Sequence, residues 1–303
     1  MGITSYNRAP TVVVTGAGGL IGSYLVGSAV RWMPDWEVVG LTRYDLDLTD
    51  RSAVKEMWQR LQPGAIVHCG AISKALACDH DPELARRVNV EATGHLSDLA
   101  SAAGARLVFL STDHVFDGHQ GFYRETDPVS PLTVYGETKV AAERVVLAHK
   151  QHLVLRTSLN AGLSPTGDRS FVEELILAWR ARRSLTLFTD EYRCPIPATV
   201  TARAIWELIR TAPGGLYHLA GRERLSRWEL GQFIASLYPE LEASLMPGTL
   251  RDYVGPRRSP DLSLNCDKVQ RCLSFELPRF QAWLQRQRGI PTKDLWRPDN
   301  EAN

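Results

Sequence analysis

A glycine-rich segment, Gly16 to Gly22, constrains the fold of this chain more than any other part of its sequence. It directly follows an apolar run, residues 11–14, and precedes residues 23–26, which can continue as a helix. Glycines let the backbone approach a phosphate, and the first N–H groups and the dipole of a helix attract negative charge. The strand, glycine turn and helix N-terminus therefore predict a dinucleotide site. The residues expected to contact the dinucleotide here are Gly16, Gly19, Leu20, Ile21 and Gly22.

Strand-like apolar runs alternate with helical patterns through the first half of the chain. The expected strands are Thr11–Thr15, Val38–Thr42, Ala65–Cys69, Leu107–Ser111 and His152–Arg156. The expected helices are Leu20–Trp32, Arg51–Leu61, Pro82–Ala103 and Val134–His149. Strands separated by helices imply a parallel sheet with right-handed crossovers. We therefore expect an α/β fold, a doubly wound parallel-sheet Rossmann domain with a smaller, interleaved C-terminal substrate lobe.

The domain boundaries follow from the point where this alternation loosens, after Arg156. Residues 1–160 are predicted to form the Rossmann domain, with later segments around 185–220 returning to it, and residues 161–303 to form mainly the substrate lobe. The pieces expected there are helices Phe171–Arg182, Val200–Thr211 and Ser226–Leu237 and strands Leu185–Phe188 and Leu216–Leu219. Residues 1–10 are expected to be a loose extension, and the tail from Gly289 a peripheral segment.

Charge and composition bound the range of partners. The net charge of +1 gives no electrostatic case for nucleic acid or an anionic membrane. No apolar run approaches the ~20 residues of a membrane span, and the N-terminus lacks the apolar core of a signal peptide. The five cysteines are scattered without a C-x-x-C pair, so we expect reduced thiols and no metal site. The cytoplasm is the expected location.

A second motif contains candidate catalytic residues. Tyr135 and Lys139 are four residues apart and would share one face of a helix. An ammonium beside a phenol lowers the phenol pKa from ~10 toward neutrality. The expected strand Leu107–Ser111 places Ser111 and Thr112 at the carboxyl edge of the sheet, where doubly wound folds bind ligands. Thr112, Tyr135 and Lys139 together predict a carbonyl reductase.

Four stretches resemble one known family, the extended short-chain dehydrogenase/reductases. They are TGAGGLIG, the STDHVFDG of residues 111–118, YGETK and the RTS of residues 156–158. STDHVFDG and a basic, proline-containing segment at 258–268 are similar, more narrowly, to the dTDP-4-dehydrorhamnose reductase branch. The match runs from about Thr11 to about Leu284. The resemblance implies NADP(H)-dependent reduction of a ketone, with a nucleotide-linked 4-keto-6-deoxy sugar as the substrate.

The expected cofactor is NADP(H), with NAD(H) as an alternative. Arg43 follows the second strand where NAD enzymes carry an acid, and its guanidinium can hold a 2′-phosphate. The resemblance places Asp47 and Leu48 at the adenine and Cys69, Gly70 and Ala71 beneath the cofactor. It also assigns Ser111, Tyr135 and Lys139 to cofactor binding, and Asn89 to fixing backbone near the lysine.

The substrate is expected to be a small, anionic molecule. Ser111 and His114 would contact it, and His114 stands where the branch usually has tyrosine. Arg193, Arg257 and Arg258 suit a diphosphate. Two other functions stay open, a reductase of a non-sugar ketone and a non-catalytic regulatory subunit that binds NADP. The expected assembly is a monomer or homodimer.

Overall fold

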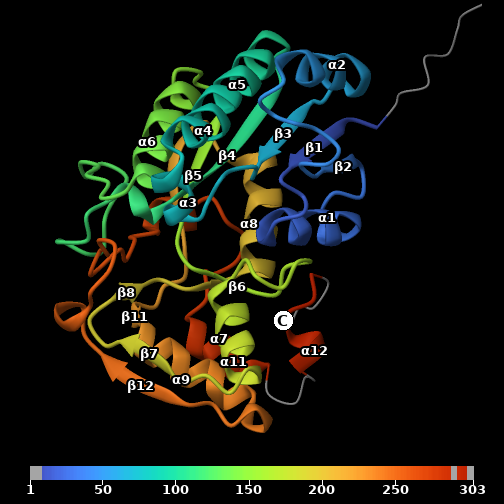
Figure 1. Cartoon of the computed structure of the whole chain (residues 1–303). Coiled ribbons are helices and arrows are strands. Elements are labelled where there is room, and N and C mark those ends of the chain that lie inside the picture. The colour runs from blue at the N-terminus through green and yellow to red at the C-terminus, as the bar shows by residue number, and fades with distance from the viewer. Residues whose placement is uncertain (1–8, 288–291, 299–303) are drawn as a thin grey trace, which may run out of the picture.

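Six parallel strands form the central sheet of the computed structural model, which describes residues 9–287 and 292–298 (Figure 1). Their order is β10-β5-β4-β3-β1-β2. The strands are β1 (Thr11–Thr15), β2 (Glu37–Leu41), β3 (Ala65–His68), β4 (Arg106–Thr112), β5 (Leu153–Thr157) and β10 (Gly215–Leu219). The strand order reverses between β1 and β3, which is where doubly wound sheets bind ligands. The predicted α/β fold with a parallel Rossmann sheet is confirmed.

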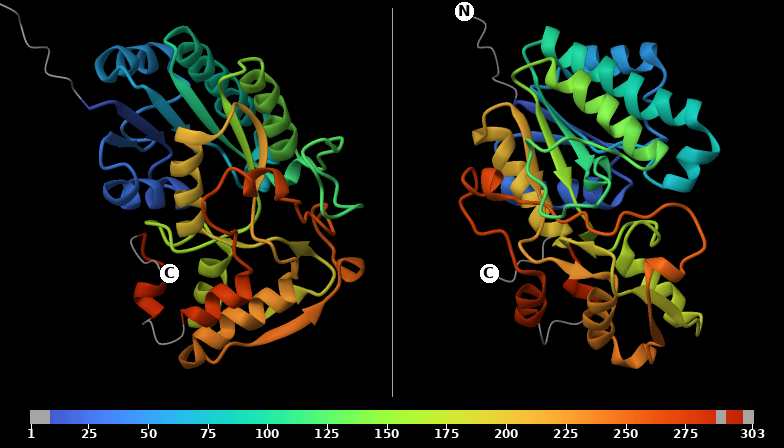
Figure 2. Two further views of the ribbon diagram at one scale, coloured as in Figure 1. Left: turned by 180° about the vertical axis from the view of Figure 1, so that it is seen from behind. Right: turned by 90° about the vertical axis from the view of Figure 1, so that its left-hand side faces the viewer.

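Helices cover both faces of this sheet (Figures 1 and 2). They are α1 (Leu20–Trp32), α2 (Arg51–Leu61), α5 (Ala92–Ala102), α6 (Val134–Leu147) and α8 (Ala198–Thr211). On β1, Val12 and Val14 pack in the core that includes α1 and α8, whereas Val13 packs in the core that includes α2, α5 and α6. Alternate residues of a strand point to opposite faces, so a strand covered on both faces requires an uninterrupted apolar run.

The helix expected at Pro82–Ala103 contains a π-helical turn. α4 (Pro82–Arg86), the π turn (Arg87–Glu91) and α5 follow one another without a break. Asn89, in the π turn, is 1% exposed, and its amide binds both the N–H (2.8 Å) and the carbonyl (3.1 Å) of Ile72. It also donates to Thr138 Oγ1 on α6 at 3.0 Å. Asn89 thus ties the segment after β3 to the helix that carries Tyr135.

The smaller lobe lies on the carboxyl side of the sheet (Figure 2). Its helices are α7 (Phe171–Arg180), α9 (Arg227–Leu237) and α11 (Phe280–Arg286), and its paired strands are β6 (Asn160–Ala161) with β9 (Ile196–Pro197), β8 (Tyr192–Arg193) with β11 (Leu225–Ser226), and β7 (Leu185–Phe188) with β12 (Leu245–Gly248). Other short α-helices in the described ranges are α3 (Ala75–His80), α10 (Asp267–Gln270) and α12 (Thr292–Leu295). None of the helices in the described ranges combines the length and the apolar character needed to cross a membrane.

Two expectations for the second half differ from the structure. β10 pairs with β5, but the expected strand at 185–188 pairs with β12 in the lobe rather than joining the central sheet. The tail is not wholly peripheral, because Leu295 and Trp296 are 2% and 3% exposed in the lobe core. Trp296 Nε1 also donates to the hydroxyl of Tyr238 at 2.8 Å. Because polar residues flank Leu295 and Trp296, the sequence pattern did not indicate that these two side chains join the lobe core. Residues 1–8 and Gly289 lie outside the described part of the chain.

Candidate active site

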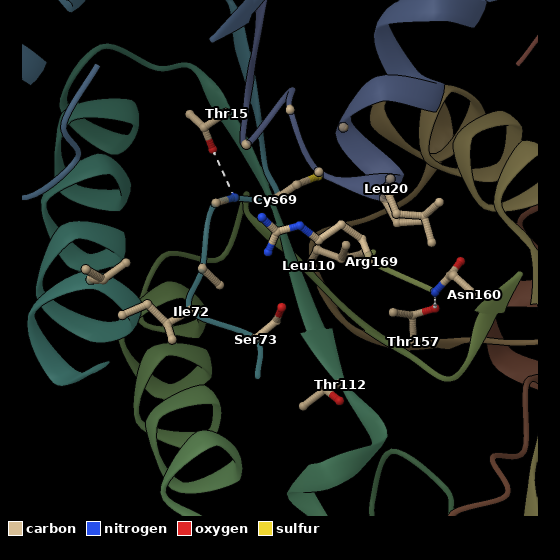
Figure 3. Close-up of a pocket in the computed structure, with 18 of the residues that line it drawn as sticks. Thr15, Leu20, Cys69, Ile72, Ser73, Leu110, Thr112, Thr157, Asn160 and Arg169 are labelled. Atoms are coloured by element: carbon tan, nitrogen blue, oxygen red, sulfur yellow. Dashed lines mark hydrogen bonds between the residues drawn. The ribbon is translucent and has the colours of Figure 1, made fainter. Parts of the chain in front are cut away.

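A cleft of about 900 Å³ opens at the carboxyl ends of the central strands, between the sheet and the smaller lobe (Figure 3). Most of the residues predicted from the sequence line it. They are Gly16, Gly19, Leu20, Ile21, Gly22, Arg43, Asp47, Leu48, Cys69, Gly70, Ala71, Ser111, Thr112, His114, Tyr135, Lys139 and Arg193. Residues far apart in the sequence line this one cleft because the parallel strands end at one edge of the sheet.

The glycine turn forms a cradle that larger side chains would fill. Gly16 has a φ of +70°, and a Cβ on it would lie 2.7 Å from the backbone nitrogen of Gly70. A Cβ on Gly22 would lie 2.3 Å from the carbonyl oxygen of Gly16. Gly19 is the N-cap of α1 and supplies no side chain to cap it. The N–H groups at the start of α1 therefore suit an anionic ligand such as a pyrophosphate.

The end of β2 presents a guanidinium rather than a carboxylate to the cleft. Arg43 is exposed and stacks over the ring of Tyr44 at 4.9 Å. Asp45 accepts hydrogen bonds from the N–H (2.8 Å) and hydroxyl (2.7 Å) of Thr42, which hold its pKa below the usual range. Asp47 accepts two hydrogen bonds within its own turn. Both acids are therefore engaged locally, whereas Arg43 is exposed at the cleft and donates to the Tyr44 hydroxyl at 2.8 Å.

The floor of the cleft is fixed by a buried histidine at the end of β3. The His68 ring nitrogens lie 2.7 Å from Thr15 Oγ1 and 2.9 Å from Thr93 Oγ1. Burial lowers the pKa of His68 to about 3, so the ring is neutral at physiological pH. A Cβ on Gly70 would lie 2.8 Å from the side chain of Leu48. A larger residue at position 70 would therefore displace the end of the Leu48 side chain at the cleft.

The candidate catalytic side chains converge from β4 and α6. Thr112 ends β4, and Tyr135 stands in the first turn of α6, which the Thr133 side chain caps. The Thr112 hydroxyl lies near enough to the Tyr135 phenol to lower the pKa of that phenol. Lys139 lies one turn further along α6, and its Nζ donates to the carbonyl oxygen of Leu110 at 2.6 Å. A hydroxyl, a phenol and an ammonium thus meet at one edge of the sheet.

The expected lowering of the Tyr135 pKa by Lys139 is wrong for this structure. Burial raises the pKa of the Tyr135 phenol above its usual value, and the nearby Thr112 hydroxyl offsets only part of that effect. Burial also lowers the pKa of Lys139 to about 8. The ammonium lies 4.0 Å over the Phe109 ring and donates to the carbonyl oxygen of Leu110 on β4. The phenol is consequently protonated at neutral pH, as a proton donor must be.

The hydroxyl of Ser111, which was expected to contact the ligands, is bound to a side chain of α6. It donates to Glu143 at 2.5 Å, and Glu143 forms a buried ion pair with Arg156 at 2.7 Å. Neighbouring strand residues point to opposite faces, so Ser111 and Thr112 cannot both direct their hydroxyls to one ligand. Thr112 is the hydroxyl that meets Tyr135.

A buried carboxylate organises the arginines of the smaller lobe. Glu191 is fully buried and pairs with Arg193 (3.1 Å), Arg227 (3.0 Å) and Arg258 (2.6 Å). Burial raises the pKa of Glu191, but the three guanidinium groups outweigh it and bring that pKa to about 2. Arg193 also lies 3.8 Å from Asp113. Three cations facing two carboxylates leave a positive excess beside the cleft.

Two predicted arginines lie outside the cleft and two others line it. Arg257 is exposed, and Arg258 faces Glu191; neither contributes to the cleft wall. Arg169 and Arg227 do line the cleft and were not predicted. A sequence signal for them exists, because each stands beside the serine of a Ser-x-x-Glu capping box that starts α7 or α9.

His114 lines the cleft next to the candidate proton donor. Its ring lies edge-on to that of Tyr135 at 6.0 Å between centroids. Burial lowers the pKa of His114 to about 4, while nearby Asp113 opposes the shift. A neutral imidazole can donate or accept one hydrogen bond at each nitrogen. Over residues 9–287 and 292–298, no three histidine, cysteine, aspartate or glutamate side chains gather as metal ligands would.

The switch-point cleft, the glycine turn and the Tyr135–Lys139 pair define a nucleotide-binding protein of the extended short-chain dehydrogenase/reductase class. More narrowly, the chain belongs to the RmlD substrate binding domain family, which matches residues 10–288. The predicted resemblance is therefore confirmed.

Relatives with two different names are similar over most of the chain. A dTDP-4-dehydrorhamnose reductase of Sinorhizobium fredii is 28% identical over 288 residues, covering 91% of this chain and 95% of the relative. A methionine adenosyltransferase 2 subunit beta of Pongo abelii is 29% identical over 273 residues, covering 86% and 81%. Among solved structures, dTDP-4-dehydrorhamnose reductase from Bacillus anthracis in complex with NADP superposes with a TM-score of 0.84 at 25% identity, covering 92% of this chain and 98% of that one.

Proposed function

We propose that this protein is an NADP(H)-dependent oxidoreductase that reduces a ketone to an alcohol, and that its substrate is a nucleotide-linked 4-keto-6-deoxy sugar. The convergence of Thr112, Tyr135 and Lys139 beside the glycine turn carries the proposal. The reductase names of relatives support the substrate class, and the NADP in a similar structure supports the cofactor.

Each catalytic side chain has one task in this proposal. Bound NADPH supplies a hydride to the carbonyl carbon. Tyr135 donates its phenolic proton to the carbonyl oxygen, and Thr112 donates a hydrogen bond to that oxygen as it becomes negative. Lys139 is charged below about pH 8 and stabilises the negative charge left on the phenol.

The remaining cleft residues would hold the dinucleotide. The turn from Gly16 to Gly22 and the start of α1 would bind the pyrophosphate, and Arg43 the 2′-phosphate. Asp47 and Leu48 would border the adenine. Cys69, Gly70 and Ala71 would lie beneath the ribose.

Replacing Arg43 with alanine tests the cofactor assignment. We expect NADPH binding to weaken by about 1.5–3 kcal/mol, the scale of a charged hydrogen bond, with little effect on NADH. Titration of each nucleotide against wild-type and variant protein measures the two losses. Equal losses of binding free energy for NADPH and NADH would contradict the assignment of Arg43 to the 2′-phosphate.

Replacing Arg227 with alanine tests anion recognition in the substrate half of the cleft. Glu191 keeps Arg193 and Arg258, so no buried carboxylate is left unpaired. The KM for a nucleotide-linked ketose is expected to rise about tenfold or more, as for a lost charged hydrogen bond, while that for a small uncharged ketone stays the same. Arg257→Ala is the matched control, because Arg257 is exposed and outside the cleft. Equal KM values for Arg227→Ala and Arg257→Ala would favour a non-sugar ketone.

A non-catalytic regulatory subunit is the second candidate, because one similar protein is named as a subunit of methionine adenosyltransferase. The presence of all three candidate catalytic side chains favours the enzyme. NADPH consumption over a panel of nucleotide-linked 4-keto sugars and simple β-keto compounds separates the two. A cytoplasmic location and a monomeric or homodimeric state stay predictions.

A further inference from the structure

Arg169 brings a positive charge from the smaller lobe into the cleft. It stands one residue before Ser170, the N-cap of α7, and lines the cleft together with Leu20 at the start of α1. Figure 3 shows its side chain pointing into the cleft, which Cys69 and Leu110 also line. We propose that Arg169 binds the diphosphate of the dinucleotide from the side opposite α1. This inference rests on the proposed NADP(H) function.

The backbone of Arg169 is fixed by a buried carboxylate. Glu173 is 2% exposed and accepts hydrogen bonds from the N–H groups of Arg169 (2.7 Å) and Ser170 (2.9 Å). The hydroxyl of Ser164 donates to the same carboxylate at 2.9 Å. These hydrogen bonds fix the backbone of the segment before α7, so the side chain of Arg169 projects from a fixed backbone position. A backbone that is already ordered lowers the entropic cost of fixing the arginine around a ligand.

The present partners of the Arg169 guanidinium are exchangeable. Its Nε lies 3.1 Å from Asp168 and 3.2 Å from Thr166 Oγ1. The side chains of Arg169 and Asp168 are both exposed, at 37% and 44%. Asp168 also pairs with Lys74 at 3.3 Å and accepts from Thr166 at 2.6 Å. Asp168 therefore keeps two partners when Arg169 turns to a phosphate. Exposed ion pairs contribute little, whereas a guanidinium binds phosphate through a planar fork.

The other lobe arginines of the cleft are not available in this way. Arg193 is 3% exposed and lies between Asp113 and Glu191, and Arg227 is bound to Glu191. Moving Arg193 away would leave both Asp113 and Glu191 short of a cation, which is costly, and Arg227 lies beside Glu191 in the substrate half of the cleft. Arg169 is thus the lobe arginine best suited to pair with a diphosphate that α1 binds from the other side.

The test measures dinucleotide binding without turnover, using NADPH and NADH on wild-type protein, Arg169→Ala, Arg169→Lys and the control Arg257→Ala. The diphosphate is common to both nucleotides, so Arg169→Ala should weaken both by roughly tenfold, the loss of one charged hydrogen bond. Arg169→Lys keeps the charge without the fork and should fall between wild type and Arg169→Ala. Asp168→Asn should bind both at least as tightly as wild type.

Three outcomes overturn the inference. Unchanged binding of both nucleotides to Arg169→Ala would exclude the contact. A loss confined to NADPH would place the arginine at the 2′-phosphate. Unchanged dinucleotide binding with a raised KM for the nucleotide-linked ketose would assign Arg169 to the substrate diphosphate. Failure of the wild-type protein to bind either dinucleotide would instead refute the proposed function itself. A melting temperature for each variant confirms that it folds.

Discussion

Replacing Tyr135 with phenylalanine is expected to lower kcat by about 10²–10⁴-fold, the usual contribution of general acid catalysis, while NADPH still binds. The substitution keeps the ring that packs beside His114 and removes the proton that the carbonyl oxygen needs. Steady-state kinetics with an identified ketone measure kcat, and nucleotide titration measures binding.

Tyr44→Phe is the matched control for this experiment. Tyr44 also lines the cleft, but it is 84% exposed and lies beside Arg43 at the end of β2. The control should retain kcat. Near-full turnover by Tyr135→Phe would show that the proposed proton donor is wrong, and the chain would be better described as a nucleotide-binding protein.

Replacing Lys139 with methionine is expected to lower kcat about 10²-fold or more and to weaken NADPH binding, without lowering the melting temperature. Burial lowers the pKa of Lys139 from 10.5 to about 8, so the unfolded chain binds this proton more tightly than the folded protein. The charged lysine therefore destabilises the fold below about pH 8, and this penalty disappears as the pH rises toward 10.5. Methionine removes the penalty at neutral pH.

We would measure kcat, NADPH affinity and melting temperature on the same preparations of wild-type protein and Lys139→Met. The wild-type kcat/KM should also fall as the pH rises through about 8, where Lys139 loses its charge, and Lys139→Met should lack that step. A variant that unfolds at lower temperature but turns over normally would assign Lys139 a structural role.

Local sequence signals were sufficient for the parts of the fold that local physics determines. The limits of α1 and α2 agree with their predicted ranges, because an uncapped glycine turn and an aspartate N-cap mark their starts. The apolar run of β1 is buried on both faces, as its sequence indicates. Gly16, with its positive φ, occupies the position where only glycine fits.

The rest depended on contacts between distant residues. Ser111 and Thr112 are both strand hydroxyls in the sequence, and only the fold shows that Ser111 donates to Glu143 on α6. A capping box follows Arg169 in the sequence, but only the fold brings the start of α7 and the start of α1 to one cleft. The raised Tyr135 pKa reflects burial, which the spacing from Lys139 does not reveal.

The most direct test of the proposed reaction follows a labelled hydride. The wild-type protein is incubated with NADPH that carries deuterium at the transferred position of C4 and with a nucleotide-linked 4-keto-6-deoxy sugar, and the product is analysed by mass spectrometry. We expect an alcohol that carries the deuterium on the former carbonyl carbon, formed in step with NADPH consumption. Recovery of unchanged ketone by a protein that demonstrably binds NADPH would contradict the assignment of this chain as a sugar-ketone reductase.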